Sequence, residues 1–252
     1  MSSTEPASRA ADGRRRTYVL VHGTWGGGWI WSRLAPLLEA AGHVVHAPTL
    51  PGLAERGGDP RGASIGLSEH IDDVAGLLVR ADLDRVTLVG HSYGGMVITG
   101  VAGRVPERVA ALVYLDAFVP SPGQSCFDLV PWLAGVFAEL SAGGGGMAAP
   151  LDPAALGVDD PGDAGWLRAH ATPMPVRTHQ EPLPGPAIPG GLPVRFVRCL
   201  RFEAFAAAAD GFRARGLPVD ELDCHHFAQV SRPAELASLL LAAAPAGTGV
   251  TA

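Results

Sequence analysis

The chain has 252 residues, of which 47% are hydrophobic and 17% are charged, and its formal net charge at pH 7 is −6. This length and apolar content suit one α/β domain with an insertion, and the acidic balance excludes a basic surface for nucleic acid or for an anionic membrane. Three cysteines do not suggest a disulfide framework, and no apolar run reaches the length of a membrane span. We therefore expect a cytoplasmic protein. The use of Arg with no Lys, together with abundant Ala, Gly and Pro, indicates a bacterial source.

Strand and helix patterns alternate along the chain. Residues 1–16 are polar and rich in Ala, Ser and Arg, which predicts a disordered N-terminal tail. The alternation that follows predicts an α/β fold with a doubly wound, mostly parallel sheet of about six strands. The expected strands are residues 18–21, 43–47, 86–89, 110–115, 194–199 and 219–222. The expected helices are residues 31–40, a helix capped by Ser68, residues 96–105, and helices near 203–215 and 234–243.

The first strand ends in a glycine-rich turn, with the sequence Val-His-Gly-Thr-Trp-Gly-Gly-Gly-Trp-Ile-Trp at residues 21–31. Glycines allow backbone N–H groups to face a ligand instead of pairing in a sheet. A phosphate-binding loop is excluded because it needs a lysine, and the dinucleotide fingerprint is excluded because its glycine spacing is absent. An oxyanion-binding loop is the better interpretation, since acyl transfer needs backbone donors aimed at one developing negative oxygen.

The strand that begins at Val86 runs into Gly-His-Ser-Tyr-Gly-Gly at residues 90–95, which places Ser92 at the tip of a sharp turn between a strand and a helix. Gly90 and Gly94 leave room for a strained backbone around this serine. The free N–H groups of the helix N-terminus can stabilise negative charge beside it. We predict that Ser92 is a nucleophile for acyl chemistry.

The sequence Asp-Cys-His-His-Phe at residues 223–227 follows the last expected strand, so the candidate base comes after the serine in chain order. Adjacent side chains near a strand end point to opposite sides, so only one of His225 and His226 can reach Ser92. The histidines of this chain do not have the spacing of a zinc site, and we expect neither a metal nor another cofactor.

These three motifs resemble the α/β-hydrolase fold superfamily, and within it the small-esterase group of plant methylesterases and hydroxynitrile lyases. The segments Val-Tyr-Leu-Asp-Ala-Phe-Val-Pro at 113–120 and His-Phe-Ala-Gln-Val-Ser-Arg-Pro at 226–233 are also similar to that group, and the resemblance spans residues 17–244. It implies that His226 is the base and that the backbone N–H groups of Thr24 and Tyr93 form the oxyanion hole. A neutral histidine base predicts activity that rises with pH through a pKa of about 6.5.

The resemblance also implies a cap over the site, formed by residues 121–190, between core segments 17–120 and 191–245. We predict a substrate pocket lined by Trp25, Trp132, Phe137 and Trp166, since large apolar side chains suit a hydrophobic substrate and exclude water.

The acid of the triad departs from the family pattern. That group places an aspartate three residues after a cysteine, and here the position holds Phe202. Two carboxylates remain: Glu203 is one residue away, and Asp116 ends the strand that follows the strand before Ser92. We favour Asp116, because reacting groups collect at the carboxyl edge of a parallel sheet, and we keep Glu203 as the alternative.

The sequence thus predicts a serine hydrolase that cleaves a carboxylic ester, lactone or thioester of a small hydrophobic molecule, as a monomer or homodimer. A biosynthetic cyclase or off-loading enzyme with the same acyl-enzyme is an alternative. A hydroxynitrile lyase is disfavoured, because that family uses a lysine beside the catalytic histidine where this chain has Phe227. A non-catalytic small-molecule receptor is disfavoured by the intact Ser and His.

Overall fold

A computed structural model describes residues 15–242 of the chain, so most of the expected N-terminal tail lies outside the described residues. Six parallel strands form one sheet in the order β2-β1-β3-β4-β7-β8. This confirms the predicted doubly wound α/β fold. The strands are β1 (Thr17–Val21), β2 (Val44–His46), β3 (Val86–His91), β4 (Val109–Leu115), β7 (Val194–Cys199) and β8 (Val219–Leu222).

Successive side chains of each strand point to opposite faces of the sheet, and the central strands β1, β3 and β4 present apolar side chains on both faces. Leu88 of β3 packs in the cluster under α2, α3 and α8, and its neighbour Val89 packs in the cluster under α1 and α10. In β4, Leu112 packs in the same cluster as Leu88, and Val113 packs in the same cluster as Val89. These helices are α1 (Ala35–Ala40), α2 (Leu67–Arg80), α3 (Gly94–Arg104), α8 (Ala206–Ala214) and α10 (Pro233–Leu241), with the short α9 (Ala228–Ser231) before α10.

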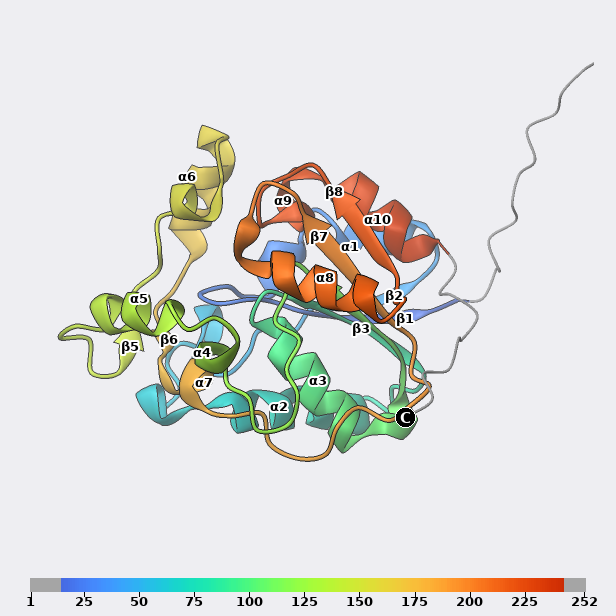
Figure 1. Cartoon of the computed structure of the whole chain (residues 1–252), viewed down its shortest axis with the longest axis horizontal. Helices are drawn as coiled ribbons and strands as arrows, with labels where there is room; N and C mark the ends of the chain where they lie inside the picture. The colour runs from blue at the N-terminus through green and yellow to red at the C-terminus, as the bar shows by residue number, and fades with distance from the viewer. Residues whose placement is uncertain (1–14, 243–252) are drawn as a thin grey trace, which may run out of the picture.

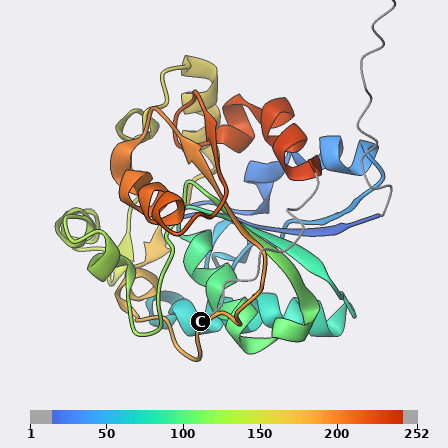
Figure 2. The ribbon, with the colours of Figure 1, turned by 45° about the vertical axis from the view of Figure 1, so that its right-hand side comes forward.

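The arrangement is therefore three-layered. In Figure 1, α2 and α3 lie below the strands, and α1 and α10 lie above them. Figure 2 shows the same layers after a turn, with the sheet twisting between the two helix layers.

The strand order places the loops that carry the first two motifs side by side. The chain passes from β1 to β2 on one side and then returns to form β3 on the other side of β1. The loops after β1 and β3 therefore leave the carboxyl edge of the sheet next to each other, at the point where ligands bind in open α/β sheets.

The short elements between residues 126 and 180 project from the carboxyl edge of the sheet, at the left of Figure 1, and the segment that follows them returns past α3, where Pro186 lies against Gly103. Strands β5 (Met147–Ala148) and β6 (Met174–Pro175) pair antiparallel. The helices are α4 (Cys126–Leu129), α5 (Leu133–Leu140), α6 (Pro161–His170) and α7 (Arg177–Gln180). Between residues 15 and 242, no helix is long and apolar enough to span a membrane.

Two helix starts differ from the sequence prediction. Ser68 is not an N-cap: α2 begins at Leu67 after Gly66, whose N–H donates to Glu69 Oε2 at 2.7 Å, and the Ser68 hydroxyl instead contacts the Glu181 carboxylate. The helix expected at residues 31–40 is a 3₁₀ turn over Gly28–Trp31 followed by α1, which has a proline in its first turn. Proline has no N–H to donate and is favoured there.

Candidate active site

Ser92 lies on the tight turn between β3 and α3, with a backbone φ of 54° that only a few per cent of non-glycine residues adopt. The glycines on either side are required by close packing. A Cβ on Gly90 would lie 2.5 Å from the Gly94 carbonyl oxygen, and one on Gly94 would lie 2.4 Å from the Val21 carbonyl oxygen. The turn therefore holds Ser92 in a strained and well-defined position, which is a feature of functional sites.

Hydrogen bonds tie this turn to the strand beside it. The N–H of Ser92 donates to the Leu115 carbonyl oxygen at 3.2 Å, and the N–H of Phe118 donates to the Ser92 carbonyl oxygen at 3.2 Å. The end of β4, which carries Asp116, is thereby fixed next to the serine.

The loop after β1 lies against Ser92, since a Cβ on Gly23 would come within 2.8 Å of Ser92 Cβ. The N–H groups of Thr24 and Tyr93, which flank this contact, donate no hydrogen bond to any group in the described part of the chain. Unpaired backbone N–H groups beside a serine are available to bind a negative oxygen, as an oxyanion hole requires.

His226 and Asp116 form a buried hydrogen-bonded pair, with His226 Nδ1 2.7 Å from Asp116 Oδ2. The second carboxylate oxygen, Oδ1, accepts the backbone N–H of Cys199 at 3.2 Å. Because β4 and β7 are neighbours in the sheet, Asp116 at the end of β4 lies beside Cys199 at the end of β7, and the loop after β8, the next strand in the sheet, brings His226 to the same edge. The bond fixes the orientation of the imidazole and leaves its Nε2 for another partner.

Aromatic rings enclose the imidazole of His226. The rings of His91 and Phe202 both lie 4.5 Å from it, and that of Phe205 stacks at 5.6 Å. This burial lowers the pKa of His226 below its ordinary value of 6.5, and burial likewise raises the pKa of the Asp116 carboxyl. The imidazole is therefore neutral at pH 7 and able to accept a proton.

The alternatives to these two residues lie elsewhere. Glu203, the alternative acid, lies in the turn after β7. Its carboxylate pairs with Arg198 at 3.0 Å, its side chain is 81% exposed, and it makes no hydrogen bond to His226. His225 points away from Ser92 and lines a surface hollow with Asp159 and Arg232. Among residues 15–242, no hydrogen bond joins Ser92 to His226, although both line one cavity. Such bonds often tighten only when substrate is present.

That cavity, which we call the Ser92 compartment, has a volume of about 60 Å³. Its wall includes Trp25, Trp132 and Phe137, as the sequence predicts for a pocket. Phe137 is buried and stacks on Trp25 at 5.8 Å, whereas Trp132 is 59% exposed and lies at the rim. Trp166 does not line this compartment, which corrects the prediction: it packs edge-on against Trp29 at 4.9 Å, because α6 lies over the loop after β1.

His179 of α7 also belongs to this region and was not predicted from the sequence. This buried ring accepts the Thr24 hydroxyl at Nε2, 3.0 Å away, and donates from Nδ1 to Thr178 Oγ1 at 2.9 Å. The direction is set because Thr178 gives its own proton to the Pro175 carbonyl oxygen at 2.6 Å. Burial lowers the pKa of His179 to about 3, so it stays neutral. His179 lies in the polar stretch Arg-Thr-His-Gln-Glu at residues 177–181, and no local pattern distinguishes it from an exposed histidine.

The part of the chain from residue 15 to 242 contains no cluster of three or more His, Cys, Asp or Glu side chains that could hold a metal ion. Cys126, Cys199 and Cys224 are buried and unpaired, as expected for packing residues.

A doubly wound parallel sheet with a serine on the turn after its third strand defines the class of α/β-fold hydrolases. The chain belongs to the alpha/beta hydrolase family, whose model matches residues 18–239. It is therefore an α/β-fold hydrolase, as the resemblance implied.

The relatives are esterases and a lyase of this fold. The chain is 39% identical, over 89% of its length and 98% of the relative's, to a carbendazim hydrolyzing esterase of Nocardioides sp. (strain SG-4G). It is 40% identical to the alpha-hydroxynitrile lyase of Arabidopsis thaliana, over 42% of each chain. Among solved structures, an extracellular alpha/beta-hydrolase from a Paenibacillus species superposes with a TM-score of 0.77 at 23% identity, covering 90% of this chain and 98% of that one.

Proposed function

We propose that this chain is a serine esterase that cleaves a carboxylic ester of a small hydrophobic molecule through an acyl-enzyme. The observation that carries the proposal is the 2.7 Å bond between His226 and Asp116 at the wall of the compartment that contains Ser92. The carbendazim hydrolyzing esterase, which the chain matches over nearly the whole length of that relative, supports ester cleavage as the reaction.

In the proposed reaction, Ser92 Oγ attacks the acyl carbon and passes its proton to Nε2 of neutral His226. Asp116 stabilises the imidazolium that forms, and the N–H groups of Thr24 and Tyr93 hold the oxygen that becomes negative. His226 then gives the proton to the departing alcohol as the ester C–O bond breaks. Water, activated by His226, attacks the acyl-enzyme, releases the acid and restores Ser92.

Residues 121–190 serve as the cap in this proposal. Phe137 of α5 roofs the compartment, and the Trp25 indole N–H donates to the Ala148 carbonyl oxygen of β5 at 3.1 Å, which ties the cap to the loop after β1. Enclosure of this kind excludes bulk water and strengthens the electrostatic interactions inside.

The test is covalent labelling followed by turnover. A fluorophosphonate should add one adduct to the intact protein, and peptide mapping should place it on Ser92. Ser92→Ala should lose labelling and should hydrolyse p-nitrophenyl acetate at least roughly 10³-fold more slowly. Ser125→Ala, which changes a buried helix-capping serine, is the control and should label normally. An adduct on another serine would refute the assignment. Transfer of the acyl group to an added alcohol with no hydrolysis would favour the cyclase alternative.

A lyase of the hydroxynitrile type is the weaker candidate. Phe227 occupies the position where that family has a lysine, and its side chain lines the Ser92 compartment without a charge to bind cyanide. The similarity to the Arabidopsis lyase covers only 42% of either chain.

A further inference from the structure

A second and larger cavity adjoins the Ser92 compartment, and we call it the outer chamber. Its volume is about 360 Å³, against about 60 Å³ for the compartment. Five residues line both spaces and form the boundary between them: Thr24, Trp25, Leu151, Leu156 and Phe227. The two spaces therefore meet at the oxyanion loop and at the residue after His226.

The volumes decide what each space can hold. An apolar cavity of about 150 Å³ accommodates benzene. The Ser92 compartment is smaller than this and takes a group the size of an acetyl or ethyl unit. The outer chamber exceeds it more than twofold and reaches the range of ligand sites, about 300–1,000 Å³.

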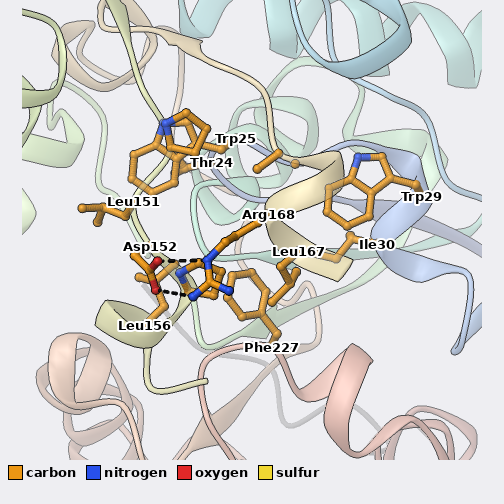
Figure 3. A pocket seen from close by; sticks show the side chains of 14 residues that line it. Thr24, Trp25, Trp29, Ile30, Leu151, Asp152, Leu156, Leu167, Arg168 and Phe227 are labelled. Atoms are coloured by element: carbon orange, nitrogen blue, oxygen red, sulfur yellow. Dashed lines mark hydrogen bonds and ion pairs between the residues drawn. The ribbon is translucent and has the colours of Figure 1, made fainter. Parts of the chain in front are cut away.

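The chamber wall suits a flat, neutral, apolar group. Figure 3 shows Trp29, Ile30 and Leu167 at one end of the chamber and Leu151 and Leu156 at the other. Trp29 is held in place by Trp166, and the Arg33 guanidinium lies 5.3 Å above the Trp166 ring. Trp166 thus affects the chamber through Trp29 without lining it.

The charged side chains of the chamber neutralise each other. Arg168 of α6 donates to both carboxylate oxygens of Asp152, at 2.9 and 3.0 Å, as the dashed lines of Figure 3 mark. Both side chains are about half exposed, so the pair lies where the chamber meets solvent. An anionic group gains little there, because the Asp152 charge offsets that of Arg168.

We propose that the two spaces divide the substrate: one side of the ester is smaller than a benzene ring and lies in the Ser92 compartment, while the other carries a neutral aromatic group that occupies the outer chamber. This inference rests on the proposed esterase function and names its substrate class. Trp25, Trp29 and Phe227 supply the aromatic surface on which such a group stacks.

Four esters of similar intrinsic reactivity test the division in the unaltered protein: ethyl acetate, 2-naphthylmethyl acetate, ethyl 2-naphthylacetate and 2-naphthylmethyl 2-naphthylacetate. At least one of the two mixed esters should exceed ethyl acetate in kcat/KM by about 10-fold, as expected for burial of a large apolar group. The ester with two naphthyl groups should fall about 100-fold below the better mixed ester. Equal turnover of the doubly bulky ester would overturn the division.

Variants that fill one cavity at a time test which of the two spaces holds the aromatic group of the substrate. Ala171 lines the outer chamber but not the Ser92 compartment, so Ala171→Phe should lower kcat/KM for the better mixed ester relative to ethyl acetate by about 10-fold. Ala204 lines the Ser92 compartment but not the chamber, so Ala204→Phe should slow all four esters. Ala138→Phe makes the same change on the exposed face of α5 and should change nothing. Equal loss on ethyl acetate and the mixed esters in Ala171→Phe would contradict the assignment.

Binding separates this inference from the proposed function. In Ser92→Ala, 2-naphthylacetamide should quench tryptophan fluorescence, and Ala171→Phe added to that background should weaken its Kd about 10-fold. If no ester is hydrolysed but this binding is found, the esterase proposal fails, while the assignment of the outer chamber as the site of the aromatic group is supported. If esters are hydrolysed but Ala171→Phe leaves the Kd unchanged, the chamber assignment fails alone.

Discussion

Replacing Asp116 by Asn removes a charge from the candidate site while preserving its shape. Asn adopts positive φ more readily than most residues, which suits the φ of 43° at this position, and its carbonyl oxygen still accepts the Cys199 N–H. The new amide N–H₂ faces His226 Nδ1 and donates to it. Nε2 then carries the imidazole proton and cannot accept another from Ser92.

The magnitude follows from the 2.7 Å contact. A carboxylate and an imidazolium whose charge centres are about 4 Å apart attract by about 4 kcal/mol at an effective dielectric constant of about 20. Losing this from the transition state lowers kcat by roughly 10³-fold. The substitution is nearly isosteric and removes a buried charge, so we expect the melting temperature to change by only a few degrees.

The assay is kcat for p-nitrophenyl acetate, with thermal unfolding measured in parallel. Glu203→Gln is the matched control: this side chain is 81% exposed and takes part only in an ion pair with Arg198, so activity should stay within twofold. If Asp116→Asn keeps wild-type activity, Asp116 has a structural role and the reasoning from the contact is wrong. If Glu203→Gln is the inactive variant, the acid has been misassigned.

Three further predictions concern the surroundings of the pair. Because burial lowers the pKa of His226 and the base must be neutral, kcat/KM should fall with decreasing pH through a midpoint below 6.5, and a midpoint above 7 would show that burial does not dominate. His179→Phe retains the aromatic packing but frees the Thr24 hydroxyl, so kcat should fall about 10-fold while KM and melting temperature hold; unchanged kcat would mean that this bond does not position the loop. Phe137→Ala should cost about 3–5 kcal/mol of unfolding free energy, whereas Trp132→Ala at the exposed rim should cost less than about 0.5 kcal/mol, and equal losses in urea denaturation would contradict the burial argument.

Local patterns were sufficient for the sheet and for the turn that carries Ser92. Strands β7 and β8 have the bounds that the sequence predicts, and β4 differs by a single residue. Both β7 and β8 begin directly after a proline, Pro193 and Pro218, and proline is a strong local signal for the boundary of an element. Ser92 was also predicted from a local pattern. The glycines at fixed spacing, the strand before them and the helix after them all lie within a short stretch of sequence. Local reasoning failed where a distant group competed for a side chain. Ser68 is a good N-cap residue, but Glu181, which directly follows α7, contacts its hydroxyl.

Contacts between distant segments needed the three-dimensional arrangement. The sequence narrowed the candidate partner of the histidine to two carboxylates, Asp116 and Glu203. Asp116 meets His226, 110 positions away in the chain, because the strands that precede them lie close together in the sheet. The bond between Thr24 and His179 spans 155 positions, and no local pattern predicts it. Trp166 was expected in the pocket because it is large and apolar. The hydrophobic effect is not directional, so it does not determine which apolar neighbour a side chain contacts. In the structure, Trp166 packs against Trp29. Periodicity determines which residues are buried, and strand order and helix packing determine which of them meet.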